Sequence, residues 1–423
     1  MMQTYSPWRT IFPVALGTCL SLLGDASIYA VLPIYTAEAG ITLGSVGIML
    51  SANRFIRVLL NGPIGIISDR LPRRILFLPA LFLGAFSTAL YALAEGFWVL
   101  LIGRLLWGLS WIGIWVAGNA IVFDMSNDTD RGRWVGLYQT AFLLGLSLGA
   151  IIGGVLTDWL GYHRAMAVEA AISFIGAVVA LVLLVETKPH SNLTTERSPS
   201  EPSLSDDSQS LEEQLSQPAP QPPVTAFWTK LSAAVGLYGV NRLIWAGCVI
   251  ATLGLFLVEQ VGETVTLYGN TIGVATMTGI LSGVSSMVGM VATPIIGNIS
   301  DKAMSRTRSR WQVAAGGLLL GVIGLVILSS GYAWAIVLGI LLGAIASGSN
   351  QGISTTIVGD ISQTQQRGRN LGILFTVGDL TSAVGPVLTY ALIPLLGLGN
   401  LYLISAGFFA LMLFLSIQFY LTK

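Results

Sequence analysis

The sequence predicts an all-α membrane protein with twelve transmembrane helices, arranged as two pseudo-symmetric bundles of six. Two observations carry this prediction. Twelve apolar runs are separated six and six by one polar stretch, and 53% of the residues are hydrophobic while only 10% are charged. Each run is near or above the ~20 residues that cross a ~30 Å hydrocarbon core. Backbone amides find no water inside lipid, so each run must be helical.

The twelve runs alternate with short polar connections along each half. In the first half they cover Ile11–Tyr35, Leu43–Ile67, Ile75–Ala94, Trp98–Phe123, Trp134–Leu156 and Ala165–Val185. In the second half they cover Leu231–Val258, Ile272–Ile299, Trp311–Leu328, Trp334–Val358, Leu371–Leu396 and Leu401–Leu421. The expected domains are therefore a bundle at 1–186, a linker at 187–230 and a second bundle at 231–423.

The linker has the composition of a disordered segment, with few apolar residues and many Ser, Pro, Glu and Gln. A tether between the two bundles is the simplest interpretation, and a regulatory docking site is the alternative. Lys and Arg predict its side of the membrane. If the N-terminus is cytoplasmic, every Lys and Arg outside the apolar runs is also cytoplasmic, except Arg164. The positive-inside rule therefore predicts a multi-pass protein of the cell membrane with both termini in the cytoplasm.

Two motifs recur in both halves at almost the same offset. Gly-Ile-Ile-Ser-Asp-Arg at 65–70 returns as Gly-Asn-Ile-Ser-Asp-Lys at 297–302, an offset of 232. An Asp followed seven residues later by Arg-Gly-Arg occurs at Asp124 and again at Asp360, an offset of 236. The halves repeat with the same topology, so an axis along the membrane normal should relate them.

These motifs resemble those of the major facilitator superfamily of secondary transporters, over nearly the whole chain. The family's loop signature, G-x-x-x-D-[RK]-x-G-[RK]-[RK], is present here with Pro72 in place of the usual Gly. The resemblance implies alternating access and a latch between conformations. Solvated loop charges that merely obey the positive-inside rule are the alternative. The expected latch residues are Gly65, Asp69, Arg70, Arg73, Arg74, Asp124, Arg131, Arg133, Gly297, Asp301, Asp360, Arg367 and Arg369.

A glycine pattern in the fifth run resembles the signature of the family's drug:proton antiporters, G-x(8)-G-x(3)-G-P-x-x-G-G. Ala150 replaces the proline, and the glycines in register are Gly136, Gly145, Gly149, Gly153 and Gly154. The resemblance implies exchange of a substrate for protons. A stripe of glycines is also what any tight contact between membrane helices requires, so close packing is the alternative.

Ionisable residues at membrane depth are costly and usually face a cavity or a partner. Asp25 is our first candidate for a proton carrier and Asp379 the second, because a carboxylate whose Arg partner moves away changes its proton affinity. Arg104, followed by Gly108 and Gly113, resembles the family's intramembrane Arg that is linked to proton transfer. A static Asp–Arg pair that holds helices together is the alternative role for both Asp residues.

The expected interior is net positive, because Arg54, Arg57, Arg104 and Arg242 face only two Asp residues. Arg suits bidentate contacts with carboxylate or phosphate, which favours an anionic or amphiphilic substrate. Indole rings offer an aromatic wall for an apolar part of it. The candidate cavity residues are Arg54, Arg57, Trp111, Trp115, Asn119, Asn241, Arg242, Asn350 and Gln351.

The sequence lacks the motifs that are typical of several other function classes. There is no Walker-type phosphate loop, no HExxH or CxxC cluster, and the only histidines are His163 and His190. We therefore expect no metal, no cofactor and no enzyme activity. The expected function is proton-coupled export of a small amphiphilic or drug-like molecule. The alternatives are transport or exchange of an organic anion, and a non-transporting membrane receptor. The expected partners are a small-molecule substrate, protons and the lipid bilayer, without nucleic acid, and the chain should act as a monomer.

Overall fold

The computed structural model describes residues 7–127, 130–186, 224–267, 270–305, 310–363 and 366–421. Within them the chain is helical except for connections and one β-hairpin. The first half contains α1 (Pro7–Ser21), α2 (Leu23–Val31), α3 (Leu43–Arg70), α4 (Arg73–Ala92), α5 (Phe97–Asp124), α6 (Arg131–Leu160) and α7 (Tyr162–Leu183). The second contains α9 (Val224–Ile244), η1 (Trp245–Val249), α10 (Ile250–Val261), β1 (Thr264–Leu267), β2 (Asn270–Gly273), α11 (Val274–Ser305), α12 (Arg310–Ser329), α13 (Ala333–Ile361) and α14 (Arg367–Leu421).

Eleven helical segments of the described residues are long and apolar enough to cross a membrane. α1 and α2 together form one of them, and so do α9, the π-helical turn η1 and α10. α14 is 55 residues long and is interrupted at Gly397, whose φ is 72°. One crossing needs only about 20 residues, so α14 has the length of two. The structure is therefore consistent with the twelve predicted crossings, and the all-α membrane fold is confirmed.

Two boundaries differ from the sequence expectation. α9 begins at Val224, inside the segment expected to be linker, and 187–223 lies outside the described residues. Ile272 and Gly273, expected at the start of a membrane run, belong to β2. Their backbones pair with Val265 and Thr264 of β1 in an antiparallel hairpin. Apolar content alone does not reveal such a pairing, because it depends on the partner strand.

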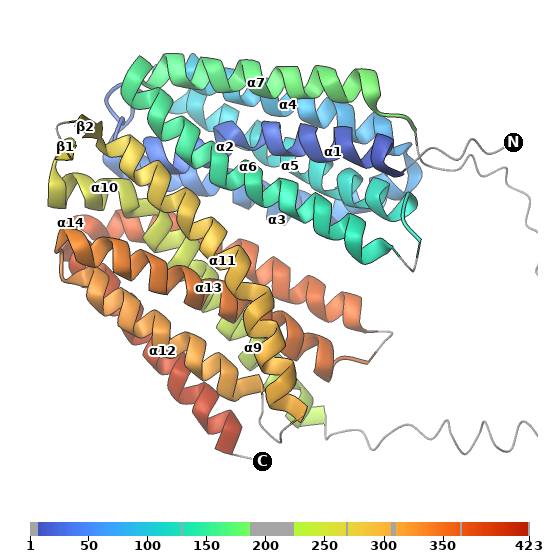
Figure 1. Cartoon of the computed structure of the whole chain (residues 1–423), viewed down its shortest axis with the longest axis vertical. Coiled ribbons are helices and arrows are strands. Elements are labelled where there is room, and N and C mark those ends of the chain that lie inside the picture. The colour runs from blue at the N-terminus through green and yellow to red at the C-terminus, as the bar shows by residue number, and fades with distance from the viewer. Residues whose placement is uncertain are drawn as a thin grey trace, which may run out of the picture.

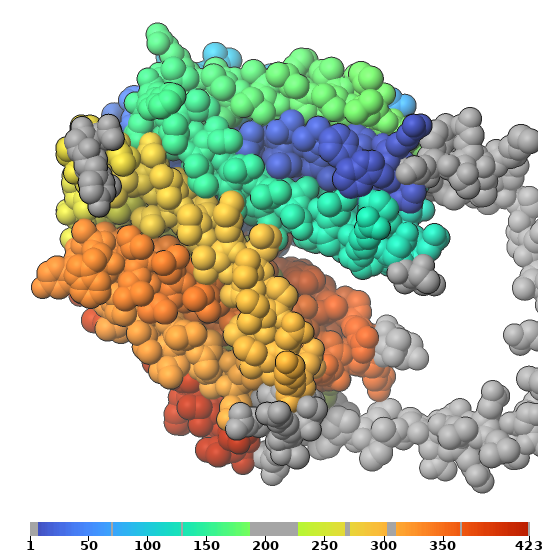
Figure 2. All heavy atoms as spheres, viewed as in Figure 1, coloured from blue at the N-terminus to red at the C-terminus, as the bar shows by residue number. Residues whose placement is uncertain are grey.

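Each half of the chain forms its own bundle around its own hydrophobic core (Figure 1). The two bundles meet at one end of the molecule and diverge at the other, and the divergence leaves a hollow on the surface (Figure 2). We call the end that carries Tyr35, Asp158 and Thr276 the closed end. The end that carries Asp124 and Asp360 is the open end.

The free space beside individual glycines indicates how close the two bundles lie at each end. At the closed end, a Cβ on Gly154 of α6 would lie 2.2 Å from the Ala275 carbonyl oxygen of α11. A Cβ on Gly47 of α3 would lie 2.6 Å from the Pro386 carbonyl oxygen of α14. Toward the open end the same four helices carry glycines with no neighbour within 4 Å: Gly62, Gly65, Gly132, Gly136, Gly297, Gly368 and Gly372. The helices that cross between the bundles are therefore tightly packed at the closed end and separated toward the open end.

Candidate transport site

A cavity of about 260 Å³ lies between the bundles and collects most of the predicted intramembrane charges. α2, α3, α5 and α6 line it from the first half, and α9, η1, α10 and α11 line it from the second. Of the predicted residues, the lining includes Asp25, Arg54, Arg57, Trp111 and Arg242. Asp25 is the only carboxylate among the lining residues.

Asp25 forms an ion pair with Arg104 inside the first bundle. Arg104 Nη1 donates to Asp25 Oδ1 at 2.6 Å, and Asn53 Nδ2 donates to the same oxygen at 3.3 Å. Asp25 Oδ2 accepts no hydrogen bond from the described residues, and the Asp25 side chain is 13% exposed. A buried ion pair is tolerated only when its groups are well hydrogen-bonded. This pair has one free carboxylate oxygen, and Asp25 is the member that reaches the cavity.

Arg104 is fully buried and its donors are nearly all used. Its Nε donates to the Met49 carbonyl oxygen at 2.9 Å. Nη2 donates to the Tyr29 hydroxyl at 3.2 Å, and Nη1 also donates to the Tyr91 hydroxyl at 3.3 Å. Asp25 and Tyr29 are four residues apart on α2, so one helix face presents both to α5. Such a network fixes the guanidinium in place, and Arg104 does not line the cavity.

Two contacts connect the bundles beside the cavity. Arg57 of α3 and Asp379 of α14 form an ion pair of 2.7 Å, and Arg54 Nη1 donates to the Ser382 carbonyl oxygen at 2.5 Å. The guanidinium of Arg54 also lies 5.0 Å from the centre of the Tyr29 ring. Both contacts join residues more than 300 positions apart in sequence. Separation of α3 from α14 would break them.

The predicted aromatic wall is a stack along α5. Trp107, Trp111 and Trp115 follow one another at intervals of four residues, with ring centres 6.4 Å and 5.5 Å apart. Phe142 of α6 lies 5.4 Å from Trp111 and 5.2 Å from Trp115. Trp111 and Phe142 line the cavity, whereas Trp115 lies behind them.

Besides Trp115, four predicted cavity residues, all of them amides, are not part of the lining. Asn119 donates to the Trp115 carbonyl oxygen of its own helix, and Gln351 lies on the exposed surface. Asn241 is buried and donates to the Ser347 carbonyl oxygen of α13. Asn350 is fully buried, and its amide has no partner among the described residues. Helix rotation decides which face a polar residue occupies, and a nearly all-apolar helix does not reveal that rotation.

Sequence reasoning missed several site residues. Tyr29, Asn53 and Tyr91 complete the Asp25–Arg104 network, and Ser282, Ser285 and Ser286 add hydroxyls to the cavity lining from α11. Two of these residues could have been identified from their neighbours in the sequence. Tyr29 follows Asp25 by one helical turn, and Asn53 is a polar residue directly before Arg54. Glu169, the only charged residue of the run Ala165–Val185, was also missed.

The open end holds two matching ion clusters at the predicted latch positions. In the first half, Arg73 Nε donates to Asp124 Oδ2 at 3.2 Å, and its Nη1 donates to the Ser68 carbonyl oxygen at 2.6 Å. In the second half, Arg310 bonds Asp360 and lies 2.8 Å from Asp301 and 3.0 Å from Ser300 Oγ. Arg310 follows Arg73 by 237 positions and is a latch residue that the sequence motifs did not reveal.

The remaining latch residues differ in surroundings. Arg74 donates to the Leu181 carbonyl oxygen, and the backbone amides of Arg73 and Arg74 donate to Glu186 at the N-terminus of α4. Gly65 and Gly297 face open space. The side chains of Asp69 and Arg70 lie outside the described residues, so their predicted roles stay predictions. The other predicted arginines lie exposed at the starts of α6 and α14: Arg131, Arg133, Arg367 and Arg369.

The glycine pattern of α6 packs against α1, α2 and α11. A Cβ on Gly145 would lie 2.6 Å from the Cys19 carbonyl oxygen, and one on Gly149 would lie 2.8 Å from Leu23 Cα. Gly153 faces Ser27 of α2, and Gly154 faces α11 of the other bundle. Gly136 meets nothing within 4 Å. The close-packing interpretation therefore accounts for four of the five glycines, and the antiporter interpretation remains a prediction.

At the closed end, Asp158 joins the two bundles. Its Oδ2 accepts the backbone N–H of Thr276 in the first turn of α11 at 2.8 Å, and its Oδ1 accepts the Tyr35 hydroxyl at 3.1 Å. A carboxylate at a helix N-terminus is stabilised by the unpaired amides and the helix dipole. Burial, together with the neighbouring Asp158, raises the pKa of the Tyr35 hydroxyl, so Tyr35 remains a donor to Asp158.

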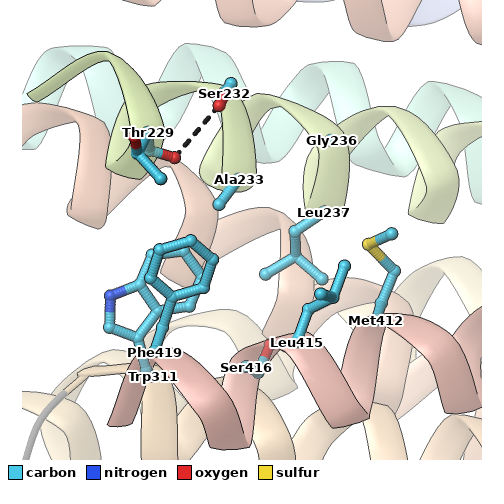
Figure 3. Close-up of a pocket in the computed structure, with 10 residues that line it drawn as sticks. All are labelled: Thr229, Ser232, Ala233, Gly236, Leu237, Trp311, Met412, Leu415, Ser416 and Phe419. Atoms are coloured by element: carbon cyan, nitrogen blue, oxygen red, sulfur yellow. Dashed lines mark hydrogen bonds between the residues drawn. The ribbon is translucent and has the colours of Figure 1, made fainter. Parts of the chain in front are cut away.

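A second cavity of about 250 Å³ lies inside the C-terminal bundle, away from the charges (Figure 3). α9, Trp311 of α12 and the last part of α14 line it, and Phe419 stacks on Trp311 with ring centres 4.9 Å apart. Its lining contains no ionisable side chain. Of the two cavities, only the central one brings predicted site residues together.

Two helical bundles around a central charged cavity form the architecture of a secondary membrane transporter. The chain belongs to the Major Facilitator Superfamily, which it matches over residues 14–386 and 309–422. It is 25% identical to the tetracycline resistance protein, class E, of Escherichia coli, over 90% of this chain and 86% of that protein.

Solved structures share the fold. A bacterial homologue of the human lysosomal transporter Spinster, in an inward-facing and unoccupied conformation, gives a TM-score of 0.74 at 16% identity and covers 99% of this chain and 98% of its own. The human organic anion transporter MFSD10 gives 0.62 at 21% identity, covering 97% of this chain and 100% of its own. At such identities the likeness extends to the fold and no further.

Proposed function

We propose that this secondary transporter exports a small amphiphilic molecule in exchange for protons, with Asp25 as the proton carrier and Arg104 as its partner. One observation carries the proposal: among the described residues, Asp25 is the only carboxylate that lines the central cavity, and it does so while paired with a buried Arg. Protonation of Asp25 would remove the charge that Arg104 holds, and so weaken the contacts between α2, α3 and α5. Proton coupling requires that the packing of helices depends in this way on whether a carboxyl group is protonated.

The positions of the basic residues indicate which side of the membrane the open end faces. The open end carries the connections rich in Arg, and the positive-inside rule assigns that end to the cytoplasm. The conformation described here is then inward-open, and Asp25 exchanges its proton with the cytoplasm. In the outward-open state the contacts of Asp158, Gly154 and Gly47 at the closed end separate. The glycine surfaces that face open space here would come together.

The experiment uses everted membrane vesicles with an imposed pH gradient, reported by a fluorescent amine. Tetracycline is the first probe, since a relative confers resistance to it. Wild type should release protons when tetracycline is added. Asp25→Asn should lose this signal and keep counterflow exchange of labelled tetracycline, because the amide mimics the protonated acid. Asp379→Asn is the matched comparison: Asp379 pairs with Arg57 across the bundles and does not line the cavity, so this variant should change the rate of the signal without abolishing it. A wild-type signal in Asp25→Asn would remove Asp25 from the coupling step.

A specific observation favours organic anion transport as the second candidate. Arg54 and Arg242 line the cavity, and neither forms an ion pair within the described part of the chain. Arg57 and Arg104 are already paired with Asp379 and Asp25. The cavity therefore offers two guanidiniums without a carboxylate partner, although Arg54 also bonds the Ser382 carbonyl oxygen, and guanidiniums suit a carboxylate. In the same vesicles Arg242→Gln should weaken uptake of benzoate and leave tetracycline-driven proton release close to wild type. Equal effects on both probes would argue against an anion site.

A further inference from the structure

Glu169 is a buried acid that the Asp25–Arg104 site does not use. It lies on α7 with no exposed surface, and no hydrogen bond of ordinary geometry reaches either carboxyl oxygen from the described residues; the Ser27 hydroxyl of α2 is the polar group beside it. It does not line the central cavity. An ionised carboxylate without a partner is strongly disfavoured in an apolar interior, so the neutral acid is the form that this position accommodates.

Further hydroxyls without partners surround the same region. Tyr162, Glu169 and Ser173 are spaced by seven and four residues, so they share one face of α7. From α6, Gly153 leaves room: a Cβ there would lie 1.9 Å from Ser27 Oγ of α2 and 2.8 Å from Glu169 Oε1. The unpartnered buried hydroxyls on these three helices belong to Ser27, Thr157, Tyr162 and Ser173. Glu169 therefore lies in a cluster of buried polar side chains within the first bundle.

No basic side chain forms an ion pair with Glu169 among the described residues. On α7 itself Tyr162 interacts electrostatically with Glu169, and the other electrostatic neighbours of Tyr162 are Tyr91 of α4, Arg104 of α5 and Glu38. Arg104 already bonds Asp25, Tyr29, Tyr91 and the Met49 carbonyl oxygen. On α2 Asp25 is held by that same Arg, and on α6 Asp158 is held by Tyr35 and Thr276 at the closed end.

In the second half of the molecule, the position equivalent to Glu169 holds a neutral residue. Gly161 and Gly397, both with positive φ, precede the last helix of each half and are 236 residues apart. The same offset relates Glu169 to Ser405, whose hydroxyl lies 3.9 Å from Cys248 Sγ. It relates Gly153 to Thr389. The fold therefore does not require a carboxyl group here.

We propose that Glu169, with Ser27 and the hydroxyls around it, forms a second proton-binding site that holds a proton in this conformation and exchanges it with solvent. The inference rests on the proton coupling proposed above and adds a site to it. Ser27 and Asp25 are two residues apart on α2, so a shift of this helix changes the surroundings of both acids. The two sites would then respond to the same movement.

The test is an infrared titration of the purified full-length protein in lipid nanodiscs. At neutral pH, wild type and Asp25→Asn should both display the C=O band of a protonated carboxylic acid that is absent from Glu169→Gln, and the band should disappear as the pH rises. Glu169→Ser, which copies Ser405, replaces Glu169→Gln if the amide variant misfolds. Identical bands in wild type and the Glu169 variant overturn the proposal, as does a Glu169 band that never responds to pH. The band does not depend on transport, so loss of tetracycline-driven proton release with the band intact would count against the proposed function alone.

Discussion

The two halves of this transporter agree at the open end and disagree in the interior. At the open end Arg73 contacts Asp124, and 237 positions later Arg310 contacts Asp360. In the interior, Arg104 is fully buried in an ion pair, and the residue 236 positions later is Ile340, which is fully buried among apolar groups. The two halves thus share the ion contacts of the open end. Among the described residues, the charged side chains buried inside a bundle, Asp25, Arg104 and Glu169, all belong to the first half.

The largest effect is expected when a buried residue of the first half is replaced by the residue at the equivalent position of the second half. Arg104→Ile leaves Asp25 as an unpaired buried charge, and removing one partner of a buried pair costs about 3–5 kcal/mol. We expect a large loss of thermal stability and of transport, measured as the melting temperature of the purified protein and as uptake in vesicles. The double variant Asp25→Asn with Arg104→Ile should regain much of the stability but no coupling. A melting temperature unchanged by Arg104→Ile would mean that the ion pair contributes nothing to this half.

An intermediate effect is expected when a tightly packed glycine of the first half is replaced by the residue at the equivalent position of the second half. Gly153→Thr copies Thr389, yet the new Cβ would collide with Ser27 Oγ and Glu169 Oε1. Overpacking a tight site costs about 1–3 kcal/mol. The melting temperature should fall accordingly. Gly136→Thr is the control, on the same helix but with nothing within 4 Å, and it should remain as stable as wild type. If both variants behave alike, the space around Gly153 is not tight.

The smallest effects should come from the two open-end clusters, and they should be equal. Arg73→Gln and Arg310→Gln each remove ion pairs that are partly exposed, which are worth at most about 1 kcal/mol. A change of that size in one conformation shifts a two-state equilibrium by about fivefold. Turnover in vesicles should therefore fall several-fold in both variants, with melting temperatures near wild type. Arg369→Gln is the control, because its side chain is exposed and bonds only Gln366 among the described residues. Unequal losses would mean that the two clusters differ in role.

The sequence by itself determined the membrane fold and its internal repeat. A run of apolar residues long enough to cross the bilayer must be helical whatever its neighbours are, so the crossings follow from local composition. The repeated Asp–Arg motifs likewise located both open-end clusters, although Arg310 was missed because it stands outside the motif that the two halves share. Asp25, Arg54, Arg57 and Arg242 were identifiable as cavity residues since charges at membrane depth need a cavity or a partner.

Only the tertiary structure decided which partner each charge takes. Asp25 pairs with Arg104 and Asp379 with Arg57, a choice that depends on how each helix is rotated and which neighbour it meets. The same rotation places Asn241 and Asn350 in the core of the second bundle and Glu169 in the core of the first. A helix that is apolar on every side gives no periodic signal to fix that rotation. Packing between helices supplies it, and packing also decides that the bundles meet at one end and part at the other.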